Sequence, residues 1–202
     1  MKVTIWSPKG TDMPTKLFNE LPEDKKQRIT QAALEEFAAN RFDDASTNTI
    51  VKNCGISKGS LFKYFESKED LYFYLTDTAA AKMAQETEGM IKDLPEDVFE
   101  RIAAYSVIEI SYYTEHPAEG KLLMNLASER DNNIAAKIAS RYGDRSQDIY
   151  GQLIEGTGFD KSRSDILKWV LEGFNKEFLE KGGGSDYMES LAPYLEILRK
   201  GI

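Results

Sequence analysis

The chain has 202 residues, of which 41% are hydrophobic and 30% are charged, a composition typical of a soluble globular protein with one or two domains. No apolar run approaches the roughly 18 residues that a membrane-spanning helix needs, and the first residues lack the apolar core of a secretory signal. The single cysteine, Cys54, excludes a disulfide framework within the chain. We therefore expect a cytoplasmic protein without a membrane partner.

The net charge of −8 taken alone disfavours nucleic acid, because phosphate contacts require lysine and arginine. The charge is unevenly distributed, however. Residues 1–75 hold 11 basic and 11 acidic side chains, and residues 45–65 contain three lysines and no acid. A local basic patch on a neutral module can still bind DNA, and we expect the acidic remainder of the chain to lie away from the duplex.

Residues 1–21 show no helical period and contain two prolines and a glycine, so we expect a flexible arm. The sequence leaves open whether residues 1–12 belong to the native protein, because Met13 is an alternative start. The first helix is predicted to begin near Pro22, since proline suits the first helical position. Its apolar residues recur at intervals of three and four, and the helix should end near Asn40.

Two short helices joined by a tight turn are predicted next. Ser46 or Thr47 begins the first of them, because a hydroxyl oxygen can accept a hydrogen bond from the unpaired amides of a first turn. Gly55 ends it, since glycine adopts the left-handed conformation at little cost. Ser57 then caps a second helix that ends near Phe65.

This arrangement is a helix-turn-helix, whose second helix can enter the major groove of DNA. The residues with the spacing to pack inward are Ile50, Ile56, Leu61 and Phe65. The residues left to face outward are Lys58, Ser60, Phe62, Lys63 and Tyr64. This outward face offers donors to phosphates and base edges, and Gly59 removes a side chain where the DNA backbone could approach.

The rest of the chain is predicted to be helical, because no strand-like alternation or repeat is convincing. Ser67 and Asp70 have the spacing of a capping box, and His116-Pro117 breaks a later helix because the residue before proline resists the α conformation. The predicted helices cover residues 68–92, 95–115, 118–129, 131–156, 163–181 and 186–200. The fold class is therefore all-α, with about nine helices in total.

A longer pattern runs through the same segment: Ile50-Val51, then Cys54-Gly55-Ile56-Ser57-Lys58-Gly59-Ser60-Leu61-Phe62-Lys63-Tyr64-Phe65, then Lys68 and Leu71. Over roughly residues 25–75 it resembles the TetR family of bacterial transcriptional repressors. That family typically shows Ile-Ala, then Ala-Gly-Val-Ser-x-Gly-x-Leu-Tyr-x-His/Tyr-Phe-x-x-Lys-x-x-Leu. Val51 and Cys54 replace small alanines here, and Phe62 replaces the common tyrosine, which removes one hydroxyl from the interface.

The resemblance implies a sequence-specific DNA-binding transcriptional regulator. It implies a flexible arm over residues 1–21, a three-helix DNA-binding domain over 22–70 and a helical ligand-binding and dimerisation domain over 71–202. The expected partners are a double-stranded DNA operator, a second copy of the chain and an unidentified small-molecule effector. The expected activity is that of a homodimeric repressor that the effector releases from a palindromic operator.

The resemblance also assigns roles to residues. It places Ser46, Thr47, Tyr64 and Lys68 on phosphates and Lys58, Ser60 and Lys63 on base edges, because phosphate contacts position a protein and base contacts specify the sequence. Ser57, Gly59 and Phe62 complete the expected DNA interface, with Phe62 offering apolar contact to a thymine methyl. An effector pocket is expected among Tyr105, Glu109, Tyr112, Tyr113, Trp169 and Asn175. A dimer interface is expected at Ile166, Val170, Phe174, Phe178, Leu191 and Leu195.

Other readings remain open. The same fold could serve a DNA binder that senses no ligand. An enzyme would need a nucleophile with a base, paired acids or metal ligands, and one histidine with one cysteine disfavours it. We therefore expect no catalytic residues, no metal and no cofactor. Cys54 is expected to be a small buried apolar residue rather than a redox switch, and the lone His116 is not expected to bind metal.

Overall fold

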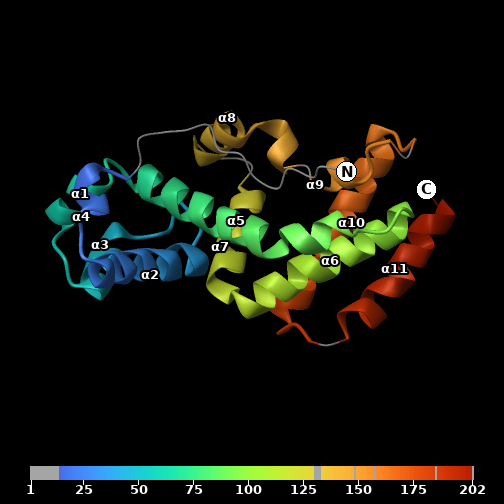
Figure 1. Ribbon diagram of the computed structural model, residues 1–202, viewed down its shortest axis with the longest axis horizontal. Coiled ribbons are helices and arrows are strands. Elements are labelled where there is room, and N and C mark those ends of the chain that lie inside the picture. The colour runs from blue at the N-terminus through green and yellow to red at the C-terminus, as the bar shows by residue number, and fades with distance from the viewer. Residues whose placement is uncertain (1–13, 130–132, 148, 157, 185, 202) are drawn as a thin grey trace. The chain divides into compact units, whose positions relative to one another are not determined.

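A computed structural model of the chain describes residues 14–129, 133–147, 149–156, 158–184 and 186–201. These residues form eleven helices and no strand (Figure 1), which confirms the predicted all-α fold. The helices are α1 Lys16–Asn19, α2 Glu23–Ala39, α3 Thr47–Cys54, α4 Lys58–Tyr64, α5 Lys68–Lys92, α6 Val98–Glu115, α7 Pro117–Ser128, α8 Asn133–Gln147, α9 Ile149–Leu153, α10 Lys161–Glu180 and α11 Tyr187–Gly201. Within the described ranges no helix is long and apolar enough to cross a membrane.

The predicted boundaries of the helices from α2 to α7 hold within a few residues, and so do those of α10 and α11. Two differences account for the larger number of helices. The stretch predicted as one helix over 131–156 is instead α8 and α9, with residue 148 outside the described part of the chain. The other difference is α1, which the sequence analysis did not predict.

The prediction of a flexible arm is wrong for residues 14–21, which form α1 and the turn that follows it. Phe18 is buried, and its ring lies 4.9 Å from that of Phe65 and 5.6 Å from that of Tyr74. Burial of this aromatic ring explains why a helix of only four residues is held in place, since isolated helices of this length are unstable. The earlier residues of the predicted arm lie outside the described part of the chain.

The described residues divide into two compact units. The first unit contains residues 14–82 together with the described part of 117–142, and the second contains residues 83–116 together with the described part of 143–201. The chain therefore enters the first unit twice. The functional division predicted at residue 70 stays a prediction.

In the first unit, α7 is attached to the end of α2. The apolar face of α2, which includes Ile29, Ala33 and Phe37, is buried. The side-chain amide of Asn125 on α7 donates to the carbonyl oxygens of Phe37 at 3.1 Å and Ala38 at 3.3 Å. These carbonyls belong to the last turn of α2, where helical backbone acceptors lack partners within the helix.

The loop between α2 and α3 is fastened to the residue after α7. The side chain of Glu129 is fully buried, and one carboxylate oxygen accepts a hydrogen bond from the backbone N–H of Phe42 at 3.2 Å. The other oxygen pairs with the guanidinium of Arg41 at 2.9 Å. A buried carboxylate is tolerated when it has such partners, so this contact fixes the loop that leads into the predicted helix-turn-helix.

In the second unit, α6, α10 and α11 lie side by side (Figure 1). Their shared core includes Ile102, Leu171, Leu191 and Leu198. Asp97 caps α6, since its carboxylate accepts from the backbone N–H groups of Phe99 and Glu100 and pairs with Arg199 of α11 at 2.6 Å. These contacts, first among them the hydrogen bond from the Glu100 amide, lower the pKa of the Asp97 carboxyl.

Candidate nucleic-acid interface

The predicted helix-turn-helix is built by local backbone rules. Ser46 caps α3, because its hydroxyl oxygen accepts from the backbone N–H of Thr49 at 3.4 Å. Gly55 ends α3 with φ of 70° and ψ of 36°, the left-handed conformation that glycine adopts without strain. Ser57 caps α4 by accepting from the backbone N–H of Ser60 at 3.1 Å. The turn between the two helices therefore depends on three residues that the sequence analysis identified.

Glu36 holds the start of α3, and the sequence analysis missed this role. Its carboxylate accepts from the backbone N–H of Ser46 at 2.7 Å and from the side-chain amide of Asn40 at 3.2 Å. The signal was present, since Glu36 is the one charged residue on the otherwise apolar inner face of α2. A polar residue at such a position usually has a hydrogen-bonding partner.

The outward face of α4 is available to a partner. Lys58, Gly59, Phe62 and Lys63 are exposed, and Ser60 is half-buried. The hydroxyls of Ser57 and Ser60 lie 2.9 Å apart. The opposite face is buried through Leu61, so the seven-residue helix presents one basic and polar side to solvent while it packs with the other.

Tyr64 does not belong to this outward face, and the prediction that it points outward is wrong. Its side chain is only 6% exposed, and its ring packs edge-on against that of Phe18 at 6.1 Å. The ammonium of Lys25 lies 5.7 Å from the centre of the same ring. The error follows from the missed helix α1, because without Phe18 no neighbour for Tyr64 is visible in the sequence.

The residues predicted to touch phosphates lie around the ends of α3 and α5. Ser46 and Thr47 are half-buried at the start of α3. The ammonium of Lys68, at the start of α5, donates to the carbonyl oxygen of Asp43 at 3.3 Å and lies 4.6 Å from the ring centre of Phe42. Burial lowers the pKa of Lys68. Lys68 thus supports the α2–α3 loop, and its phosphate contact stays a prediction.

The residues predicted for an effector pocket are brought together in the second unit, with one exception. The carboxylate of Glu109 accepts from the hydroxyl of Tyr113 at 3.2 Å and from the side-chain amide of Asn175 at 3.0 Å. Burial, together with the charge of Glu109, raises the pKa of Tyr113 and that of Tyr105 well above their usual value. Tyr112 lies beside Tyr113, with ring centroids 6.2 Å apart.

Tyr187 completes this cluster and was not predicted. Its hydroxyl donates to the side-chain oxygen of Asn175 at 2.5 Å. Burial raises the pKa of the Tyr187 hydroxyl. Trp169 is the exception among the predicted residues. Its side chain is 60% exposed, because α10 turns Leu167 and Leu171 toward the core instead. The placement of Trp169 in the pocket is therefore wrong.

The residues predicted for the dimer interface separate into three groups by their exposure. Ile166 is exposed, whereas Val170, Phe174 and Phe178 are half-buried and pack against the core of the second unit. Leu191 and Leu195 are buried within that core. The prediction is wrong for these two leucines, since α11 uses them to pack inside its own chain.

Cys54 and His116, which were considered as a redox switch and a metal ligand, both pack against other parts of the chain. Cys54 is buried, and burial raises the pKa of its thiol, which disfavours the thiolate that a redox sensor needs. The Nε2 atom of His116 lies 2.8 Å from a carboxylate oxygen of Glu86, and its ring packs against Tyr112 at 4.6 Å. This side chain therefore joins the end of α5 to the end of α6 within the second unit.

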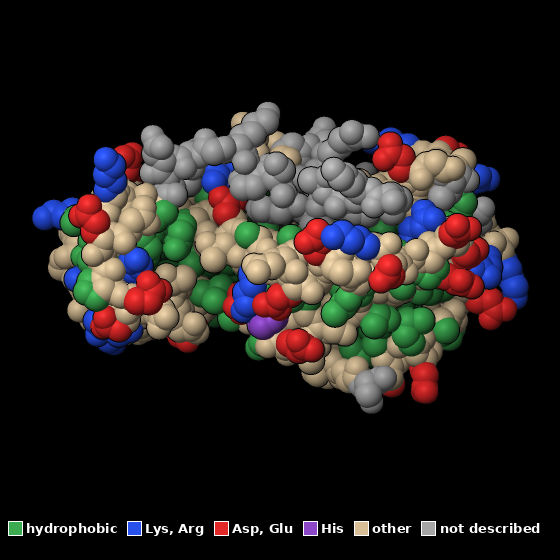
Figure 2. All heavy atoms as spheres, viewed as in Figure 1, with side chains coloured by type: hydrophobic (Ala, Val, Ile, Leu, Met, Phe, Trp, Pro, Cys, Tyr) green, Lys and Arg blue, Asp and Glu red, His purple; other side chains and the backbone are tan. Residues whose placement is uncertain are grey.

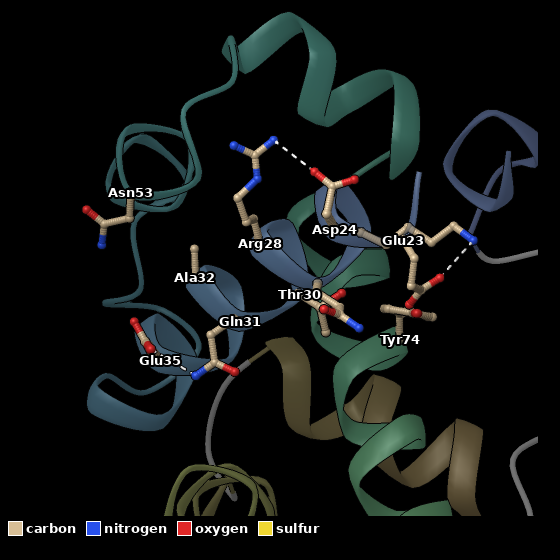
Figure 3. A pocket seen from close by; sticks show the side chains of 11 residues that line it. Glu23, Asp24, Arg28, Thr30, Gln31, Ala32, Glu35, Asn53 and Tyr74 are labelled. Atoms are coloured by element: carbon tan, nitrogen blue, oxygen red, sulfur yellow. Dashed lines mark hydrogen bonds and ion pairs between the residues drawn. The ribbon is translucent and has the colours of Figure 1, made fainter. Parts of the chain in front are cut away.

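A shallow depression of about 850 Å³ follows the polar face of α2 (Figure 3). In this view Arg28 points toward Asp24 and Gln31 toward Glu35, each pair lying one helical turn apart. Tyr74 from α5 and Asn53 from α3 lie at its margins. An ion pair and a hydrogen-bonded pair of this spacing are typical of a solvated helix face, so this surface gives no support to a ligand site.

Comparison with known proteins agrees with this geometry. Residues 29–75 match the model of the bacterial regulatory proteins of the tetR family. YdgC, an HTH-type transcriptional regulator of Bacillus subtilis (strain 168), is 30% identical over 82 residues, which are 39% of this chain and 42% of YdgC. The sequence match to this relative therefore spans less than half of its length.

Two solved structures show that the likeness in fold extends further. A TetR family transcriptional regulator from Chloroflexus aurantiacus J-10-fl is similar with a TM-score of 0.65 at 23% identity, over 93% of this chain and 94% of that one. FadR from Bacillus subtilis, solved in complex with stearoyl-CoA, has a TM-score of 0.61 at 20% identity, over 87% and 98% of the two chains. The capped helix pair lies inside the residues that match the tetR family of bacterial regulatory proteins, and the fold of the chain is similar to that of both solved structures.

Proposed function

We propose that the chain is a homodimeric repressor that reads a palindromic operator through α4 and leaves it when a small effector binds. The observation that carries the proposal is the outward face of α4, where Lys58, Ser60 and Lys63 stand beside Gly59 on an otherwise packed helix. We assign these three side chains to base edges. Ser46, Thr47 and Lys68 would contact phosphates, and Phe62 would supply apolar contact.

Gly59 offers a direct test of the proposed DNA interface. The fold has room for a side chain at this position, whereas a bound duplex would leave none. A Cβ at this position would meet only the Ser57 hydroxyl oxygen, at an ordinary 3.9 Å. A glutamate suits the first turn of a helix, so Gly59→Glu should melt at the wild-type temperature or above it. Its operator affinity should nevertheless fall by roughly tenfold or more, because the added carboxylate faces the phosphates.

The measurement is a gel shift on an operator selected from random fragments, with a melting curve beside it. Gly89→Glu is the matched control, since Gly89 lies on α5 and a Cβ there meets nothing within 4 Å. It adds the same charge to the chain on a helix other than α4. If Gly59→Glu binds as tightly as Gly89→Glu, the assignment of the reading face is wrong.

A second copy of the chain is the proposed partner of α10 and α11. The large apolar side chains that these helices leave exposed are Ile166, Trp169, Met188, Tyr194 and Ile197. Figure 2 shows apolar side chains gathered on the surface over α11, and Tyr194 contacts Phe174 of α10 at a ring distance of 5.3 Å. Apolar surface of this kind marks an interaction site, and a twofold dimer would place two α4 helices on two half-sites.

The polar cluster around Glu109 is the proposed effector site. FadR, which shares the fold, binds stearoyl-CoA. Here an acidic side chain stands among Tyr105, Tyr113 and Tyr187, and its charge acts on all three. A carboxylate with aromatic neighbours favours a cationic or aromatic ligand, because both the charge and the ring faces attract cations. We therefore propose organic cations and aromatic amines as the first class to test.

Thermal shift measurements with a panel of compounds test effector binding. A ligand present at 100 times its dissociation constant stabilises the native state by about 2.7 kcal/mol. We expect an organic cation to raise the melting temperature and to release the operator, and Glu109→Gln to lose both effects while still binding DNA. If no compound of any charge does either, the rival function is favoured, a DNA binder that senses no ligand.

A further inference from the structure

The C-terminal end of α4 is held by residues far away in the chain. Thr15, just before α1, donates from its backbone N–H to the carbonyl oxygen of Tyr64 at 3.2 Å. Its hydroxyl donates to the carbonyl oxygen of Lys63 at 3.0 Å. The last four carbonyls of a helix have no partner within it, so Thr15 supplies hydrogen-bond donors to two of the four in α4.

The side chain of Phe18 secures the same end of α4 from α1. Its ring packs against Tyr64, against Phe65 at the end of α4 and against Tyr74 on α5. Phe18 is buried although α1 has only four residues. The contacts of Thr15 and Phe18 therefore join the end of α4 to α5 through a separate piece of chain.

This attachment matters because α4 is short. A helix of seven residues has few internal hydrogen bonds, and its ends fray easily. Lys63, which the proposed function assigns to a base edge, lies in the last turn, and its own carbonyl is one of the two that Thr15 holds. The direction of the Lys63 side chain follows from the backbone that carries it.

We infer that Thr15 and Phe18 form a clamp that sets the position of Lys63 and thereby part of the operator specificity. Thr15 is a positioning residue, which acts on the DNA through α4. The clamp lies outside residues 29–75, which match the family model, so it is a feature of this chain beyond the matched helix-turn-helix. The inference rests on the proposed reading role of α4.

Three substitutions at Thr15 separate the two hydrogen bonds. Thr15→Val removes the hydroxyl and keeps the N–H, whereas Thr15→Pro removes both donors. Thr15 has φ of −60°, which proline adopts without strain. From the usual strength of such bonds, we expect operator affinity to fall roughly fivefold for Thr15→Val and roughly 25-fold for Thr15→Pro. Thr15→Ser keeps both donors and should bind as the wild type does.

The readouts distinguish positioning from loss of fold and from direct contact. Because no phosphate contact is removed, binding to a scrambled duplex and the salt dependence of operator binding should both stay at wild-type values. The preference among operator bases should relax at the positions nearest the end of α4. Leu17→Ala is the matched control, since Leu17 lies on α1 beside Phe18 and is 47% exposed, and it should change nothing.

The following outcomes would each overturn the inference. A parallel loss of affinity for operator and scrambled duplex, accompanied by a lower melting temperature, would mean that Thr15 only supports the fold. A shallower salt dependence would mean that the segment touches phosphates itself. If Thr15→Pro binds the operator as tightly as the wild type does, the inferred clamp is refuted, whereas the proposed function is unaffected. If the wild-type protein itself prefers no DNA sequence, the proposed function fails first.

Discussion

Replacing Trp169 and Ile197 together with glutamate is expected to convert the proposed dimer into a monomer and to lower operator affinity by roughly 100-fold or more. The two side chains are 60% and 69% exposed, so the isolated chain loses little packing when they change. In a dimer, however, each glutamate would place a charge in an apolar contact, where desolvation is costly. The large loss of operator affinity is expected because a monomer cannot bind both half-sites at once.

Light scattering measures the mass, and a gel shift on operators with one or two half-sites measures the binding. Met90→Glu is the control for an added carboxylate, because Met90 is 59% exposed and receives one glutamate on α5 rather than on α10 or α11. It should stay dimeric. If the double variant keeps the dimer mass and full affinity, the proposed interface must lie elsewhere.

Replacing Glu129 with alanine is expected to lower the free energy of unfolding by about 3 kcal/mol. The change removes the acceptor of the buried Phe42 N–H, and an unpaired buried donor costs about 1–3 kcal/mol. It also removes the partner of Arg41, but that side chain is 56% exposed and can be solvated again. Glu129→Gln keeps one oxygen for the Phe42 amide, so its loss should be smaller.

Urea unfolding at neutral pH measures both variants. Glu119→Ala is the control, since Glu119 pairs with Lys82 at the same 2.9 Å but lies nearer the surface. Exposed pairs contribute about 0–1 kcal/mol, and the control should lose no more than that. Equal losses for Glu119→Ala and Glu129→Ala would show that the burial of Glu129 adds nothing to its contact.

The sequence predicted those elements whose signals are local. Ser46, Gly55 and Ser57 act on backbone groups within three residues of themselves, so the pattern was sufficient to place the turn between α3 and α4. The outward face of α4 followed from helical spacing alone, apart from Tyr64. There the deciding neighbour, Phe18, lies 46 positions earlier in the chain, and no periodicity reports such a contact.

The candidate sites of the second unit depended on a different kind of information. On α10 the residues Ile166 and Val170 stand next to Leu167 and Leu171, and both pairs are apolar. Spacing shows that two adjacent stripes exist, but only the packing of α6 and α11 decides which stripe is buried. Trp169 and Leu191 were assigned to the wrong sides for this reason. Glu109 and Asn175, both named for the pocket that the resemblance implies, are joined by a hydrogen bond.

The contacts of Asn125 and Glu129 bear on how parts of this chain could be joined to other proteins. The simplest chimera of this N-terminal module with a foreign sensor would be cut once, at the end of the module. Here α7 holds the last turn of α2, and the residue after it holds the next loop. A graft would have to carry residues 117–142 along with 14–82, so the transferable part consists of two separate stretches of chain.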